Sequence, residues 1–201
     1  MRLAQLLSTT VLVSLLAARA HAGVATGVTD IRVGDNPFFP PTGLGDADVA
    51  SFDPQNQKAV LEKDFEHLGD IPIIIDRGPS QGVDTFHIDE RVKNDTGVDW
   101  TDFHLTFDSI DANPALSVSF LNVDNPTGEW TNIQSNLDDL SLFGSVPAGG
   151  TFSLSFDLQM TDQQGAFALF GIHEFPTVPE PTTLALMGIG LAGIAAAGRR
   201  R

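Results

Sequence analysis

Two histidines and two aspartates have the types and spacing that a metal site needs. His87 and Asp89 alternate along one stretch of the chain, and Asp102 and His104 alternate along another. If the two stretches pair as an antiparallel hairpin, His87 lies opposite His104 and Asp89 lies opposite Asp102. Two imidazoles beside two carboxylates suit a transition metal such as zinc.

This metal site depends on the register that pairs Ile88 with Phe103, which puts the apolar residues of both strands on one face. The alternative, which we favour, is an exposed polar face on which Arg91 stacks on Trp100 and the histidines stay neutral. We therefore expect no required cofactor. Two ions are compatible with the sequence: zinc at these four residues, and calcium at other carboxylates of the acidic chain.

The sequence carries no motif of a known catalytic centre. It contains no cysteine, which excludes thiol nucleophiles and disulfides. It also lacks a Gly-x-Ser-x-Gly elbow, a His-Glu-x-x-His pair and a phosphate-binding loop. We expect the protein not to be an enzyme, and a secreted hydrolase is the weaker alternative.

The charge of the chain is strongly negative. It has 201 residues and a formal net charge of −15, from 26 acidic and 11 basic residues. Five of the bases and one of the acids lie in the two terminal segments, which leaves 25 acids against 6 bases between them. A domain of this charge repels phosphate backbones, so nucleic acid is excluded as a partner.

Residues 1–22 have the pattern of a secretion signal. Arg2 supplies a positive start, residues 6–18 are mostly apolar, and Ala20 and Ala22 form a small-x-small cleavage site before Gly23. The sequence therefore predicts an N-terminal signal helix, export across the inner membrane by the secretion translocase, and cleavage before Gly23.

Residues 178–201 form a second targeting segment. Its motif and its stop signal consist of Val178, Pro179, Glu180, Pro181, Arg199, Arg200 and Arg201. The uncharged run between them, residues 182–198, reaches about 25 Å as a helix, enough to cross a bilayer core. The arginines would stop transfer on the cytoplasmic side, which leaves the preceding domain outside.

The order of these three parts resembles the PEP-CTERM sorting signal of Gram-negative bacteria. The resemblance implies recognition by an exosortase, a membrane protease that removes the helix. The protein would then be anchored in the membrane only transiently before it reaches the cell surface or the extracellular space. A plain C-terminal membrane anchor is the alternative.

Residues 23–177 read as an acidic β-domain. Apolar and polar residues alternate from Thr151 to Met160, as in a strand with one buried face. Further strands are expected at 71–75, 85–93, 100–109, 116–123, 137–143 and 166–174, whereas 34–57 is expected to be irregular. This spacing favours an all-β, antiparallel β-sandwich of immunoglobulin-like architecture, flanked by the two terminal helices.

Residues 94–104 read Asn-x-Thr-Gly-x-x-Trp-x-Asp-Phe-His. The stretch resembles one in functionally obscure PEP-CTERM proteins, and the implied role is a hairpin that joins core strands. We expect a structural or adhesive surface or matrix protein that associates with extracellular polysaccharide. A calcium- or zinc-dependent carbohydrate-binding module is the alternative.

Overall fold

The computed structural model describes residues 27–34, 45–109, 116–136 and 138–178. In this part of the chain, all regular structure is β-strand. The strands are β1 (Val28–Val33), β2 (Gly45–Asp53), β3 (Lys58–Phe65), β4 (Ile73–Arg77), β5 (Gly82–Asn94), β6 (Trp100–Ser109), β7 (Leu116–Asp124), β8 (Trp130–Ser135), β9 (Asp139–Val146), β10 (Thr151–Asp162) and β11 (Ala168–Thr177).

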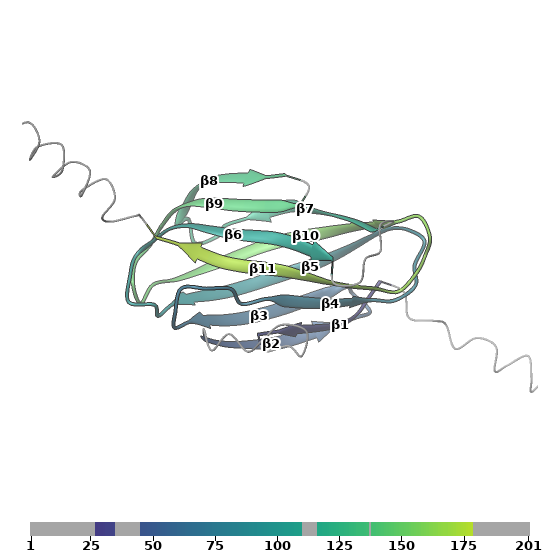
Figure 1. Ribbon diagram of the computed structural model, residues 1–201, viewed down its shortest axis with the longest axis horizontal. Coiled ribbons are helices and arrows are strands. Elements are labelled where there is room, and N and C mark those ends of the chain that lie inside the picture. Colours follow the sequence, from purple (N-terminus) through teal and green to yellow (C-terminus); the bar gives the residue numbers. More distant parts are fainter. Residues whose placement is uncertain (1–26, 35–44, 110–115, 137, 179–201) are drawn as a thin grey trace, which may run out of the picture.

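The strands form two sheets that face each other (Figure 1). One sheet has six strands in the order β1-β4-β11-β6-β9-β8, and the other has five in the order β2-β3-β5-β10-β7. Neighbouring strands are antiparallel except for β3 and β5, which run parallel. The predicted all-β sandwich is therefore confirmed. Its described strands outnumber the seven or nine of immunoglobulin domains.

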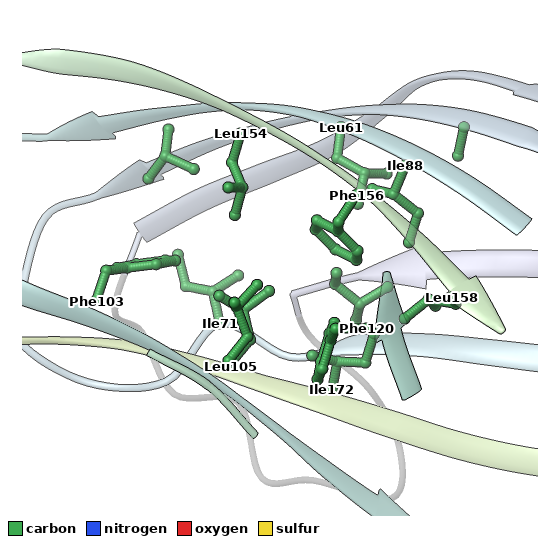
Figure 2. Close-up of a cluster of buried hydrophobic side chains, with 14 of the residues drawn as sticks. Leu61, Ile71, Ile88, Phe103, Leu105, Phe120, Leu154, Phe156, Leu158 and Ile172 are labelled. Atoms are coloured by element: carbon green, nitrogen blue, oxygen red, sulfur yellow. The ribbon is translucent and has the colours of Figure 1, made fainter. Parts of the chain in front are cut away.

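The alternation of apolar and polar residues produces the core. In β10, every second side chain from Phe152 to Met160 is buried, and the residues between them are half-buried on the outer face. Apolar side chains from both sheets meet in the space between them, as Figure 2 shows for Phe156 and Leu61 of one sheet and Leu105 and Ile172 of the other. Burial of this apolar surface is the main force that holds the sheets together.

Several strands differ from the sequence expectations. The expected irregular segment 34–57 contains β2, so this expectation is wrong for residues 45–53. Four strands, β1, β2, β3 and β8, lie outside the ranges we expected. β1, β2 and β8 are at the ends of their sheets, and all but the first residue of β8 are exposed. Such edge strands have weak apolar alternation and are therefore difficult to recognise in a sequence. The two expected terminal helices lie outside the described residues.

The predicted hairpin between residues 85–93 and 100–109 is wrong. β5 pairs with β3 and β10 in one sheet, whereas β6 pairs with β11 and β9 in the other. Both strands turn their apolar faces into the same core, but they do so from opposite sides. Residues 95–99 therefore cross from one sheet to the other rather than close a hairpin.

Asn94 explains the distinctive sequence of this crossing. Its side-chain amide is buried and donates hydrogen bonds to the carbonyl oxygens of Val98 and Val146 at 2.9 and 3.0 Å. Its Oδ1 accepts from the Thr96 backbone N–H at 3.1 Å and from the Thr96 hydroxyl at 2.7 Å. The Trp100 indole in turn donates to that hydroxyl at 3.0 Å. The Asn, Thr and Trp of the motif thus hold the crossing loop in one conformation.

Within the described ranges, no helix is long and apolar enough to cross a membrane.

Candidate functional site

The structure separates the four residues of the predicted metal site. His87 and Asp89 lie on the outer face of β5 in the five-stranded sheet, and Asp102 and His104 lie on β6 in the six-stranded sheet. The prediction that these four residues share a metal is therefore wrong, because the hairpin register on which it depended does not exist. In the described part of the chain, no three His, Asp or Glu side chains gather in a way that could hold a metal ion.

His104 is held by its own sheet. Its Nδ1 lies 3.0 Å from the Ser141 hydroxyl on β9, and its Nε2 lies 3.3 Å from Asp102 Oδ2. The ring stacks on Phe175 of β11 with a centroid distance of 5.3 Å. These contacts account for both ring nitrogens, so His104 and Asp102 form a local structural pair.

His87 belongs to a network of hydrogen bonds and ion pairs across the outer face of the five-stranded sheet, here called the His87 network. Its Nδ1 lies 2.7 Å from Asp157 Oδ1 on β10, and its Nε2 lies 3.1 Å from Asp89 Oδ1. Lys58 of β3 pairs with Asp89 at 2.6 Å, and the Asn122 amide of β7 donates to Asp157 at 2.6 Å. The His87 network therefore links four neighbouring strands, β3, β5, β10 and β7. Sequence reasoning missed Asp157 and Asn122, although Asp157 occupies a predicted outward position of its strand.

The His87 network contains the residue types of a catalytic triad. The Ser155 hydroxyl lies 3.5 Å from His87 Nε2, and Asp157 contacts the other ring nitrogen. However, His87 Nε2 also lies 3.1 Å from Asp89 Oδ1, so this carboxylate is closer to the nitrogen than the Ser155 hydroxyl is. The nitrogen that would have to accept the serine proton in a triad therefore has another, nearer partner.

The pKa values of both aspartates in the His87 network are lowered. Burial raises the pKa of Asp157, but hydrogen bonds from Asn122 and His87 outweigh it, and the pKa is lowered overall. Burial likewise raises the pKa of Asp89, and hydrogen bonds from Lys58 and Ser155 again lower it overall. The centre of this sheet face therefore carries two carboxylates whose ionised form is favoured by their hydrogen-bond partners.

Beside the His87 network, a shallow groove of about 250 Å³ crosses the same sheet. Four strands line it, namely β2, β3, β5 and β10. The lining residues are Asp46, Ala47, Asp48, Glu62, Lys63, Asp64, Arg91, Lys93 and Thr151. Seven of these residues turn polar or charged side chains outward, whereas the Lys63 side chain is buried, so the groove suits a hydrophilic ligand.

Polar groups of the groove are only partly used by the protein itself. Lys93 pairs with Asp64 at 3.3 Å and also with Asp95, and the hydrogen bonds that it donates to Asp95 and Asp64 raise the pKa of Lys93. Asp64 Oδ1 is buried and has no hydrogen-bond partner among the described residues. In that same part of the chain, Arg91 and Glu62 make no ion pair. Arg91 and Glu62 are exposed, so their charged groups are available to bind a ligand from outside.

The C-terminal targeting segment follows the fold without a break. Thr177, the last residue of β11, pairs with Asp102 of β6, and Val178 packs against the core. β11 ends at the left-hand edge of the sandwich in Figure 1. Residues Pro179, Glu180, Pro181, Arg199, Arg200 and Arg201 lie outside the described residues, as do Ala20, Ala22 and Gly23 of the N-terminal segment.

The comparisons with known proteins address this segment. No curated protein matches the chain, and no solved structure matches its fold. One family model matches, at residues 177–201, and it describes a PEP-CTERM protein-sorting motif. This motif is recognised by exosortase, and it implies export and transient membrane anchoring before the protein reaches the surface or the extracellular space. The match covers the predicted sorting residues and confirms the resemblance: the chain carries a C-terminal PEP-CTERM protein-sorting motif.

Proposed function

We propose that this protein is a structural or adhesive component of the cell surface or extracellular matrix and that it associates with exopolysaccharide. The observation that carries the proposal is the continuity between β11 and the sorting motif, which begins at Thr177 while that residue is still paired in the sheet. Removal of the tail would therefore release the β-sandwich with almost nothing attached to its end. Whatever the mature protein does is then a property of the sandwich surface.

The groove on the five-stranded sheet is the proposed contact with polysaccharide. It offers the Arg91 guanidinium, the Glu62 and Asp64 carboxylates and the Thr151 hydroxyl on one face. Such groups donate to and accept from sugar hydroxyls, and charged partners make the stronger hydrogen bonds. A shallow groove that crosses four strands suits a long polymer that is held at several points.

The proposal includes no catalytic activity. Its support is the surroundings of His87, whose two ring nitrogens contact Asp157 and Asp89 at shorter distances than the Ser155 hydroxyl. The surface around it is a sheet face, and the nearby Ser155 lies in the middle of β10 rather than on a strained turn.

The test uses the mature protein recovered from the cells that produce it. Affinity electrophoresis through a gel containing exopolysaccharide from the same cells measures retardation of the protein. We expect Arg91→Ala to weaken binding about tenfold, because a lost charge-assisted hydrogen bond costs about 1.5 kcal/mol. The matched control is Asn132→Ala, an exposed position on β8 of the other sheet.

Two outcomes would reject the groove as the binding surface. One is absence of retardation of the wild-type protein, and the other is equal retardation of the wild type and Arg91→Ala. Repeating the measurement with calcium and with a chelator separates direct contact from contact that a cation bridges. Binding that disappears with the chelator would favour the calcium-dependent carbohydrate-binding alternative.

A further inference from the structure

Three charged side chains lie together in the core of the sandwich. Lys63 is on β3, Glu90 on β5 and Glu174 on β11, and the side chain of each is 0% exposed. Each occupies an inward position of its strand, and the residues two positions before and after it, which face the same way, are apolar. The first two belong to the five-stranded sheet and the third to the six-stranded sheet, so this buried triad bridges the two sheets.

The triad is in close contact. Lys63 Nζ donates to Glu90 Oε1 at 3.1 Å and also to Glu174 Oε2. The remaining carboxyl oxygens, Glu90 Oε2 and Glu174 Oε1, are buried without a hydrogen-bond donor among the described residues. Both carboxyl groups contact the same atom, Lys63 Nζ. A single proton held between the carboxyl groups would satisfy both oxygens.

The electrostatics of the site place that proton on Glu174. Burial raises the pKa of Glu174 far above its usual value, and the nearby charge of Glu90 raises it further, against the opposing effect of Lys63. Burial lowers the pKa of Lys63, but attraction to Glu174 and Glu90 outweighs it. The triad then consists of an ammonium, a carboxylate and a carboxylic acid, with no net charge, as a low-dielectric core requires.

We propose that the buried triad forms an intramolecular isopeptide bond between Lys63 Nζ and Glu174 Cδ, with Glu90 as the group that carries the proton. The arrangement supplies each part that amide formation needs: an amine, a neutral carboxylic acid and a base in contact with the amine. The surrounding core excludes the bulk water that would otherwise solvate and separate the three groups.

The step balances within the triad. Glu90 takes one proton from the Lys63 ammonium, which leaves a neutral amine. The amine lone pair attacks Glu174 Cδ, the new Nζ–Cδ bond forms, and the Cδ–OH bond breaks as a nitrogen proton passes through Glu90 to the departing hydroxyl. One water molecule leaves. The products are an uncharged amide and a protonated Glu90, so a buried ion pair is replaced by neutral groups without an oxidant or a co-reactant.

The other lysine pairs of the protein lack these conditions. Lys58 contacts Asp89, and Lys93 contacts Asp64, but the side chains of both lysines are 45% exposed. The pKa of Asp89 is lowered, so its carboxylate stays ionised and is a poor electrophile. Cross-linking is therefore specific to the buried triad, where it joins positions 111 residues apart in the chain.

Intact-mass measurement of the full protein, recovered from the cells that produce it, tests the proposal directly. We expect a mass lower by one water than the processed sequence requires. After proteolysis, tandem mass spectrometry should find a branched peptide that joins the segments containing Lys63 and Glu174. A mass equal to that of the processed sequence would overturn the proposal, and so would a missing water that maps to any other residues.

Variants identify the role of each group. Lys63→Met removes the nucleophile, and Glu90→Gln keeps the nucleophile and the electrophile but removes the base. We expect both to show the full sequence mass, whereas the control Lys58→Met should still lack one water. Loss of water from Lys63→Met, or undiminished loss from Glu90→Gln, would contradict the mechanism. If a variant fails to fold, the branched peptide of the wild-type protein still decides the question.

Discussion

Arg77 Nη1 lies 3.1 Å from Asp162 Oδ2, and both side chains are fully buried. Arg77 ends β4 of the six-stranded sheet and Asp162 ends β10 of the five-stranded sheet, so this ion pair joins the sheets at one end of the sandwich. Asp84 of β5 also pairs with the guanidinium, at 2.5 Å. The buried triad joins the two sheets at another place, through Lys63 and Glu174.

Replacing Arg77 with methionine should strongly destabilise the protein. The substitution keeps the apolar stem but leaves Asp162 and Asp84 without their cation, and breaking a buried ion pair costs about 3–5 kcal/mol. Urea unfolding measures this loss. Arg32→Met is the control, because Arg32 pairs with Asp76 at 2.7 Å with its side chain 40% exposed, and such a pair contributes about 0–1 kcal/mol. Equal effects of the two variants would contradict the prediction.

Acid should destabilise the protein through Asp162. Burial raises the pKa of this carboxyl, but the backbone N–H groups of Gln164 and Gly165 and the Arg77 guanidinium outweigh it, so the pKa is lowered overall. A carboxylate with a lower pKa in the folded state adds stability above its unfolded pKa of about 3.9, and this stability is lost as the pH falls through the folded pKa. We expect the free energy of unfolding to decrease below about pH 4.

The variant Asp162→Asn isolates this contribution. It should be less stable than the wild type at neutral pH, and its free energy of unfolding should fall less steeply on acidification. Urea titrations at several pH values give both slopes. Parallel curves for the two proteins would show that Asp162 does not supply the pH dependence.

Asn94→Ala should loosen the crossing between the sheets. The change removes the amide that donates to Val98 and Val146 and the oxygen that accepts from Thr96. Buried backbone carbonyls left without donors cost about 1–3 kcal/mol each, and we expect a total loss of about 2–4 kcal/mol by thermal or urea unfolding. Asn132→Ala, at an exposed position of β8, should change stability by less than about 0.5 kcal/mol.

Gly144→Ala should disturb the edge of the six-stranded sheet. A Cβ at this position would lie 2.1 Å from the carbonyl oxygen of Glu129 and 2.9 Å from the Trp130 Cα. The backbone of β8 must shift, at a cost of about 1–3 kcal/mol. Hydrogen exchange of the β8 amides would detect the shift. The control is Ser145→Ala, at the neighbouring exposed position, which should leave the exchange of the β8 amides unchanged. Unchanged exchange in Gly144→Ala as well would contradict the prediction.

Glu180→Ala should prevent removal of the C-terminal tail. Glu180 is the central residue of the matched sorting motif, and we predict that its loss leaves residues 182–201 on the protein. Intact mass at the C-terminus distinguishes the two forms. Glu66→Ala, an exposed acid in the β3–β4 loop, should be processed like the wild type. Identical C-termini of the wild type and Glu180→Ala would contradict the prediction.

The sequence predicts strands better than it predicts their partners. β10 is evident because five apolar residues alternate with polar ones, and the predicted bounds of β6 match the observed ones. β5 and β6 were also recognised, but not their placement in different sheets. Alternation requires Ile88 and Phe103 to face a core and leaves open whether they do so from the same sheet or from opposite ones.

The candidate site was predicted less well for a related reason. His87 was correctly placed on an outer face, but its partner is Asp157 of β10, which lies 70 residues away in the chain. The sequence carries a signal for the buried triad: Glu90 and Glu174 occupy positions that the alternation of their strands assigns to apolar residues, two places after Ile88 and Ile172 respectively. A charge at an inward position indicates a buried partner, although it does not identify which one.

β11 is the last strand along the described residues, yet it lies between β4 and β6 inside the six-stranded sheet. Until it is inserted, β1 and β4 have no connection to β6, β9 and β8 within that sheet. Synthesis and export both proceed from the N-terminus, so the sheet stays in two halves until residue 177 has emerged. The strand that completes the sheet is therefore the one that the sorting motif directly follows, so the fold cannot be complete before the chain has emerged as far as the start of that motif.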